Sequence, residues 1–432
     1  MSQKNTSDGT KSTREREPRA PIRVAVTGIG PITAVGSGLE AFWDGLRRER
    51  SPIRRITRFD ASIWRSRLAA EVDDFDPEDY IERKAIRRLD RFGHFAVASS
   101  RMALRDAGLE TNHLDPDRVA VQMGTALGGV AYGEVQGAKL ALEGPRAVDS
   151  RIALTTFGGA ASCSVAIEFG FSGPNSTNAM SCASGTIAIG EAWRLIRDGT
   201  VDVALAGGIE SPLAPLCFGA FAMIRAMSTR NDDPESACRP FDSARDGFVM
   251  GEGACTLVLE RLDHAIARGA RIYAELAGYG TTNDAYHMTA PRPDGSQAAR
   301  AMTLALNAAD VQPDEIEFIS PHGSSTTLND STETLAIKSV LGDHAYDVPI
   351  SGTKPYHAHA LGASGAIEAA VCCLAMTRGW IPPTINFEAG DEICDLDYVP
   401  GSGRFLKPRI SLSNSFGFGG INAALVLVTP ES

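Results

Sequence analysis

Two similar segments divide this chain into halves. The residues RVAVTGIG at positions 23–30 and RIYAELAGYG at positions 271–280 each lead a run of β-branched and small apolar residues directly into glycines. Such a run predicts a buried strand, and its recurrence indicates a duplicated unit. We place the boundary near residue 270, which gives halves of residues 22–270 and 271–432. Residues 1–21 are polar and charged and predict a disordered tail.

Strand-like and helix-like segments alternate along both halves. The strand-like runs include RVAVQMG, VDVALAGG, CTLVLE, EIEFIS and AALVLV, and the helix-like stretches include FGHFAVASSRMALRDAG and GSQAARAMTLALNAADV. Alternation of this kind predicts an α/β fold with buried sheets.

Composition argues against several classes of protein. The net charge of -11 is the wrong sign for a dedicated nucleic-acid binder, which displaces counterions from phosphates with lysine and arginine. No run reaches the roughly eighteen apolar residues of a membrane span, and the first twenty residues have no apolar stretch. We therefore expect no membrane association and a cytoplasmic location, where the eight cysteines are reduced.

The segment NAMSCASG sets Cys182 among small residues, just before a helical stretch that runs to about Asp198. A thiol at a helix N-terminus is stabilised as the thiolate by the helix dipole and by free N–H groups. Small neighbours also let an acyl group approach the backbone closely. A lone cysteine is more often a small buried hydrophobe, so the nucleophile interpretation depends on other residues.

Two histidine segments supply those residues. SPHGSSTTLND contains His322, and SGTKPYHAHALGASG contains Lys354, His357 and His359. Both segments are rich in glycine and small polar residues, which is typical of active-site loops. Any one histidine can be structural, but a cysteine, a lysine and two such loops together favour an active site. No nearby cysteine or carboxylate completes a tetrahedral set with the two close histidines, so we predict no metal.

The other glycine-rich and cysteine-rich segments carry no separate chemistry. GIGPITAVG, GTALGG and FGFGG lack the spacings of dinucleotide-binding and phosphate-binding loops. Cys372 and Cys373 lie in an apolar helical stretch and are predicted to belong to the core.

Taken in order along the chain, eight motifs resemble those of the β-ketoacyl-acyl-carrier-protein synthase family, in particular its type II elongating synthases and type II polyketide ketosynthases. They are RVAVTGIGPITAVG, GTALGG, SCASG, MSTRNDDPESACRPFDSARDGFVMGEGA, NDAYHMTAP, PHGSSTTLND, GTKPYHAHALGASGAIEA and LSNSFGFGGINAAL. From the first motif to the last, the resemblance spans nearly all of residues 22–429. The resemblance implies a thiolase-like fold of duplicated halves in a layered α-β-α-β-α architecture.

The resemblance also implies an activity. Such enzymes condense an acyl-enzyme thioester with malonyl-acyl-carrier protein in a decarboxylative Claisen reaction, which gives 3-oxoacyl-acyl-carrier protein without a metal or organic cofactor. The pathway is fatty-acid or specialised polyketide or polyene biosynthesis. The implied partners are an acyl carrier protein and, in a dimer, a second copy or a related ketosynthase-like subunit.

Individual roles follow from the matching positions. Cys182 is similar to the acyl-accepting nucleophile, and His322 and His359 resemble the pair that promotes decarboxylation and stabilises the enolate. Phe418 resembles the gating phenylalanine whose backbone N–H joins that of Cys182 in an oxyanion hole. Lys354 resembles a lysine of the active-site charge network.

Further positions complete the implied site. Glu368 matches the buried glutamate that follows the second histidine. The residues implied at the substrate are Leu127, Ile152, Asp284, Thr289, Ser324 and Thr326.

A basic segment, residues 83–91, spaces its cations at i, i+3 and i+4, which predicts one charged helix face. This face is either solvated and paired with Glu82 and Asp90, or it docks an acidic protein. The resemblance favours docking, because positions similar to those that grip the carrier protein are occupied here by Lys84, Arg87, Arg88 and Arg225.

The chain departs from the family pattern before its second histidine. That histidine usually follows Thr-Gly, whereas His357 and Ala358 stand here. We assign the catalytic role to His359, because the five-residue spacing from Lys354 and the following LGASG both fit. SPHGSST also replaces the commoner AHGTST, and Ile152 stands where phenylalanine is frequent. These differences favour a specialised polyketide or polyene role over a housekeeping one.

Three alternative functions remain open from the sequence. A thiolase acting on CoA esters shares the fold, although SCASG and PHGSST resemble the carrier-protein branch more closely. A non-catalytic chain-length-determining subunit shares the fold too, but it typically lacks the cysteine. A thioester hydrolase is compatible with the same nucleophile and oxyanion hole.

Overall fold

One long sheet crosses the whole molecule. The computed structural model describes residues 21–430, so the predicted tail of residues 1–21 lies almost entirely outside the described residues. The strands follow the order β11-β12-β13-β10-β1-β9-β7-β5-β6, and β2 (Gly36–Ser37) pairs with β1. Their bounds are β1 Val24–Thr33, β5 Val119–Gly124, β6 Asn175–Asn178, β7 Val203–Glu210, β9 Gly253–Arg261, β10 Ala274–Asn283, β11 Phe318–Ser320, β12 Ile410–Gly417 and β13 Ile421–Val428.

A small second sheet lies beside the site. It consists of β3 (Arg54–Arg55), β4 (Leu68–Ala70) and β8 (Met250–Gly251). The helices are α1 Leu39–Arg47, α2 Arg83–Ile86, α3 Arg91–Asp106, α4 Val130–Glu143, α5 Ile152–Thr155, α6 Ala160–Phe169, α7 Ser184–Arg197, α8 Pro215–Met223, α9 Leu262–Ala267, α10 Ser296–Ala309, α11 Thr327–Leu341, α12 Lys354–His357 and α13 Ser364–Arg378.

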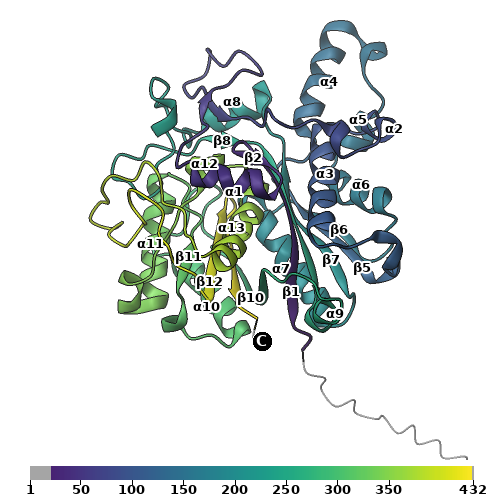
Figure 1. Cartoon of the computed structure of the whole chain (residues 1–432). Coiled ribbons are helices and arrows are strands. Elements are labelled where there is room, and N and C mark those ends of the chain that lie inside the picture. Colours follow the sequence, from purple (N-terminus) through teal and green to yellow (C-terminus); the bar gives the residue numbers. More distant parts are fainter. Residues whose placement is uncertain (1–20, 431–432) are drawn as a thin grey trace, which may run out of the picture.

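Helices and strands stack in five layers (Figure 1). Helix α3 covers β1 and β9 on one outer face, and α10 covers β10 and β13 on the other. Between them, α7 and α13 contact strands from both halves of the sheet. The predicted layered α/β architecture is therefore confirmed.

The duplication is visible in the first strand of each half. Strands β1 and β10 have ten residues each, and each shifts its register just before a glycine, at Gly28 and at Gly278. A Cβ on Gly28 would lie 2.2 Å from the carbonyl oxygen of Ala103 in α3, and one on Gly278 would lie 2.1 Å from that of Ala305 in α10. The glycines thus let the outer helices pack directly against the strands.

The predicted boundary near residue 270 falls between α9 and β10. The sheet is continuous across it, because Val24 of β1 pairs with Leu276 of β10. The division into residues 22–270 and 271–432 remains a prediction.

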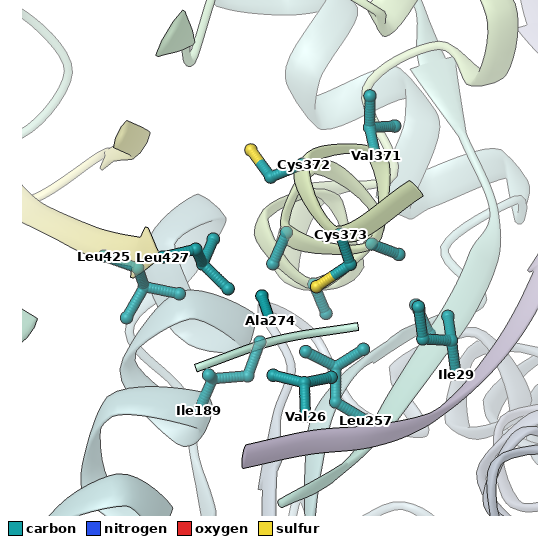
Figure 2. Close-up of a cluster of buried hydrophobic side chains, with 14 of the residues drawn as sticks. Val26, Ile29, Ile189, Leu257, Ala274, Val371, Cys372, Cys373, Leu425 and Leu427 are labelled. Atoms are coloured by element: carbon teal, nitrogen blue, oxygen red, sulfur yellow. The ribbon is translucent and has the colours of Figure 1, made fainter. Parts of the chain in front are cut away.

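Helix α13 fills the centre of the molecule, and its residues Ser364–Met376 are all buried. Figure 2 shows Cys373 of this helix beside Val26, Leu257 and Ala274, which come from three adjacent strands. The predicted core position of Cys372 and Cys373 is confirmed, since both are fully buried. The stretch Leu361–Arg378 is long and apolar enough to cross a membrane, but 89% of it is buried inside the protein, as in a core helix.

The close helix–strand contact predicts a large stability difference between two Gly→Ala variants. A Cβ on Gly280 would lie 2.1 Å from the carbonyl oxygen of Ala301, whereas a Cβ on the exposed Gly137 of α4 would meet nothing within 4 Å. We expect Gly280→Ala to lower the free energy of unfolding by about 1–3 kcal/mol through overpacking. Gly137→Ala should raise it slightly, because alanine has the higher helix propensity. Chemical denaturation of both variants measures this difference, and equal stabilities would contradict the packing described.

Candidate active site

Cys182 lies in a turn of 3-10 helix, Ser181–Ala183, directly before α7. Its side chain is buried, with 7% of the residue exposed. The turn begins at Ser181, whose φ of 52° is in the left-handed region. A Cβ on Gly417 would lie 3.1 Å from the Cys182 nitrogen, so the glycine-rich turn after β12 passes close to the cysteine backbone. The two turns together enclose the thiol.

The ionisation of Cys182 differs from the expectation for a helix N-terminus. Burial raises the pKa of the thiol above its usual range. The hydrogen bond with Ser181, the charge of Lys354 and the backbone N–H of Phe418 lower this pKa, but together they do not offset the burial. The buried site therefore favours the neutral thiol form of Cys182.

The two predicted histidines meet near this thiol. The imidazole rings of His322 and His359 lie edge to face, with their centroids 5.2 Å apart. Ser364 Oγ lies 2.9 Å from Nδ1 of His359, which packs its ring against Phe248. Burial and the nearby Lys354 charge hold the pKa of both histidines well below the usual range. Both are therefore neutral and can donate a hydrogen bond to a developing oxyanion.

Lys354 links the second histidine segment to the first. Its ammonium is fully buried, lies 2.5 Å from Glu368 Oε1 and donates to the carbonyl oxygen of His322. Glu333 Oε1 and Oε2 accept the backbone N–H groups of His322 and Gly323, each at 2.8 Å. Burial raises the pKa of Glu333 and Glu368 to about 7. The network fixes the His322 backbone from both sides.

A cavity of about 340 Å³ contains Cys182, His322 and His359 in its wall. Four of the predicted substrate residues also line it, namely Asp284, Thr289, Ser324 and Thr326. Leu127 does not line the cavity, but it packs on the hydrophobic cluster that includes Cys182. Ile152 reaches neither the cavity nor this cluster. It lies in α5, which packs against α4 instead.

Phe418 lies at the cavity on the turn between β12 and β13, where its ring stacks on Phe221 with centroids 6.2 Å apart. A second loop, residues 283–292, closes over this turn. The Asp284 carboxylate accepts a hydrogen bond from the Asn422 side-chain amide at 2.7 Å. The backbone N–H of Asp284 donates to the Gly420 carbonyl oxygen at 2.7 Å. The backbone N–H of Gly419 donates to the Met288 carbonyl oxygen at 2.7 Å. A movement of one loop relative to the other would therefore break these bonds.

Glu210 is a site residue that sequence reasoning missed. It ends β7, is fully buried, and accepts the N–H groups of Ala126, Leu127 and Gly362 as well as the Thr125 hydroxyl. The carboxylate thereby ties two loops together beside Cys182. Burial raises its pKa to about 7. The only sequence signal was an acidic residue at the end of a buried strand, separated from its two glycines by one residue.

The basic segment is not one helix face, so that expectation was wrong. Helix α2 has only four residues and ends before Arg87, because Asp90 caps the next helix by accepting the Gly93 N–H at 2.9 Å. Arg91 turns inward and bonds to Glu252 at 2.8 Å. Arg83 is exposed and pairs with Glu78 at 2.9 Å. The other cations of the segment are exposed, as is Arg225 elsewhere in the chain, and among residues 21–430 the side chains of these four form no ion pair or hydrogen bond. They are Lys84, Arg87, Arg88 and Arg225.

No group of three or more histidine, cysteine, aspartate or glutamate side chains within residues 21–430 is arranged to hold a metal ion. His357, which the sequence left without a role, does not line the cavity.

Comparison with known proteins identifies the family. The family model "Beta-ketoacyl synthase, N-terminal domain" matches residues 22–265, and "Beta-ketoacyl synthase, C-terminal domain" matches residues 273–388. A 3-oxoacyl-[acyl-carrier-protein] synthase 2 of Synechocystis is 48% identical over 403 residues, which are 93% of this chain and 97% of the relative.

Two solved structures agree over the whole fold. The ishigamide ketosynthase/chain length factor has a TM-score of 0.90 at 39% identity, over 95% of this chain and 100% of that one. A type II polyketide ketosynthase solved with its acyl-carrier protein, AntDE:AntF, has a TM-score of 0.87 at 36% identity, over 95% and 100%. The chain therefore belongs to the β-ketoacyl synthase family.

Proposed function

We propose that this protein catalyses decarboxylative condensation of an acyl group held on Cys182 with malonyl-acyl-carrier protein. The product is 3-oxoacyl-acyl-carrier protein, in fatty-acid or specialised polyketide biosynthesis. The observation that carries the proposal is the common cavity of about 340 Å³, in which one thiol faces two neutral histidines. The similarity to named 3-oxoacyl-[acyl-carrier-protein] synthases supports it.

In the first half-reaction, the Cys182 sulfur attacks the carbonyl carbon of an acyl thioester. The bond from that carbon to the carrier sulfur breaks, and the thiol proton leaves with the carrier thiol. We assign the tetrahedral oxyanion to the backbone N–H groups of Cys182 and Phe418. The backbone N–H of Phe418 lowers the pKa of the Cys182 thiol, which supports its closeness to the reacting group. One thioester replaces another, so this step has little net cost.

In the second half-reaction, the carbon–carbon bond to the malonyl carboxylate breaks and carbon dioxide leaves. His322 and His359 donate hydrogen bonds to the enolate oxygen that forms, which neutral imidazoles can do without transferring a proton. The enolate carbon then attacks the acyl carbonyl on Cys182. The carbon–sulfur bond to Cys182 breaks, and the released thiolate takes up a proton.

Three competing functions receive less support. A chain-length-determining subunit needs no nucleophile, yet Cys182, His322 and His359 are all present at one cavity. The exposed cations Lys84, Arg87 and Arg88 suit an acidic carrier protein, and the named relatives act on acyl-carrier protein rather than being CoA thiolases. A hydrolase would pass the acyl group from Cys182 to water, whereas the named relatives that this chain resembles are synthases.

We also propose a dimer with a second copy or a related subunit, and a cytoplasmic location. Strand β6 is the last strand of the sheet, and its residues are exposed or half-buried. Large apolar residues beside it are exposed, with exposed fractions of 83% for Ile167 and 46% for Met180. Apolar surface next to an open sheet edge is typical of a subunit interface.

Because Cys182 is the proposed nucleophile, we expect that no acyl group can be transferred to the Cys182→Ala variant. The side chains are of similar size, so we expect an unchanged fold by circular dichroism. Intact-mass spectrometry after incubation with acyl-carrier protein should detect acylated wild type and no acylated variant. Acylation of Cys182→Ala at the wild-type rate would contradict the assignment of the nucleophile.

Because His359 is assigned to condensation and not to acyl loading, we expect His359→Ala to slow only one of these two steps. We expect acyl loading of Cys182 to persist, because the thioester exchange does not need this imidazole. Condensation with malonyl-acyl-carrier protein should fall by about 100-fold or more, since a positioned donor is lost. Separate assays of loading and of 3-oxoacyl product measure the two steps. Equal loss of both would show that His359 serves the nucleophile rather than the enolate.

The exposed cations predict an effect on carrier-protein substrates only. Changing Arg87→Glu and Arg88→Glu together should raise the apparent KM for acyl-carrier protein and weaken its salt dependence, because charges at the edge of an interface act mainly on encounter. Turnover of a small thioester without the carrier should stay unchanged. The matched control is Arg105→Glu with Arg300→Glu, two exposed arginines on α3 and α10. An equal change in KM for both double variants would exclude a local docking surface.

A further inference from the structure

The residue before the second catalytic histidine has a strained backbone. Ala358 has a φ of 53° and a ψ of -169°, a combination that is almost confined to glycine. It is fully buried, so the conformation does not belong to a free surface loop. Such strain persists only where surrounding contacts hold the peptide in place.

The imidazole of His357 provides one such contact. Its Nδ1 lies 2.8 Å from the carbonyl oxygen of Ala358, and its Nε2 lies 3.2 Å from Thr353 Oγ1. A carbonyl oxygen only accepts, so Nδ1 carries the proton and Nε2 accepts the Thr353 hydroxyl. Burial lowers the pKa of His357 to about 3, which keeps this single tautomer neutral. Both ring nitrogens are therefore engaged within the protein.

The strained peptide leads directly into His359. The backbone N–H of His359 donates to the Val249 carbonyl oxygen at 2.7 Å, and its own carbonyl oxygen accepts the Gly251 N–H at 3.0 Å. A Cβ on Gly251 would lie 3.2 Å from the Cβ of Ala358, so this methyl group packs against β8 without spare room. Any rotation of the Ala358 peptide would pull His359 away from β8 and from the cavity.

We propose that His357 is a positioning residue that holds the Ala358 carbonyl, and with it the strained backbone that aims His359 at the cavity. The proposal rests on the proposed function, because it assigns the condensing role to His359. In this proposal His357 does not touch the substrate, because the residue is fully buried and does not line the cavity. The chain thus uses a histidine and an alanine where the related motif usually has threonine and glycine.

The test is a cycle of variants at the two positions. His357→Thr removes the bond to the carbonyl but leaves the strain. We expect kcat for condensation to fall roughly 10-fold to 100-fold, as for a small misplacement of a reacting group, with an unchanged KM. Acyl loading of Cys182 should remain at the wild-type rate. The double variant His357→Thr/Ala358→Gly should regain most of the lost kcat, because glycine adopts the same backbone conformation without help.

A conservative variant tests the hydrogen bond itself. His357→Asn retains an N–H donor near the place of Nδ1, so it should keep most of the kcat, and it stays informative if the threonine variant does not fold. The matched control is His344→Thr, which removes another imidazole bonded to a backbone carbonyl, at 2.9 Å from Ile316 O, away from the cavity. Its kcat should be that of the wild type.

Three outcomes would overturn the proposal while wild type still condenses: full kcat in His357→Thr, no recovery in the double variant, or equal losses in His357→Asn and His357→Thr. If wild type itself loaded Cys182 but formed no 3-oxoacyl product, the proposed function would fail instead. Crystal structures of His357→Thr and of the double variant give an independent readout. The 2.9 Å contact between His359 Nδ1 and Ser364 should be lost in the first and restored in the second.

Discussion

The close packing of two helix N-termini determines where the chemistry can occur. Helices α7 and α13 both begin after a 3-10 turn, and these turns meet at the centre of the molecule. A Cβ on Gly185 would lie 2.9 Å from the Gly362 carbonyl oxygen, and one on Gly208 would lie 2.3 Å from it. Only glycines allow this approach. Because the cysteine precedes one helix and a histidine precedes the other, the same packing brings Cys182 and His359 to one cavity.

Burial then determines the charge of the site. The thiol, the two cavity histidines and the carboxyl groups of Glu210, Glu333 and Glu368 are all buried, and burial shifts the pKa of each toward its neutral form. The ammonium of Lys354 is the buried cation beside them, and it is bonded to Glu368. Neutral imidazoles suit a reaction in which negative charge develops on an oxygen and no proton has to be transferred to it.

Local sequence patterns predicted the fold, and the motif resemblance named many of the residues that the structure brings to one cavity. Glycines and other small residues recur at three places where backbones pack closely in the structure. These are the first strand of each half, the segment around Cys182 and the LGASG after His359. Properties that depend on burial or on distant segments were not predictable in the same way. Three such properties depend on tertiary contacts. They are the raised pKa of Cys182, the hydrogen bonds by which Glu210 joins two loops, and the position of Ile152 away from the cavity. The basic segment was misread because the capping of α3 by Asp90 interrupts a periodicity that looks continuous in the sequence.

The central claim is that one cavity performs both half-reactions. It is tested most directly by incubating the wild-type protein with acyl-carrier protein and malonyl-carrier protein labelled with carbon-13 in the free carboxyl group, and then measuring the carrier proteins by intact-mass spectrometry. The account predicts an unlabelled 3-oxoacyl-carrier protein that is longer than the starting acyl chain by the two remaining malonyl carbons, with all label released as carbon dioxide. Retention of label in the product, or release of a free fatty acid without condensation, would contradict it.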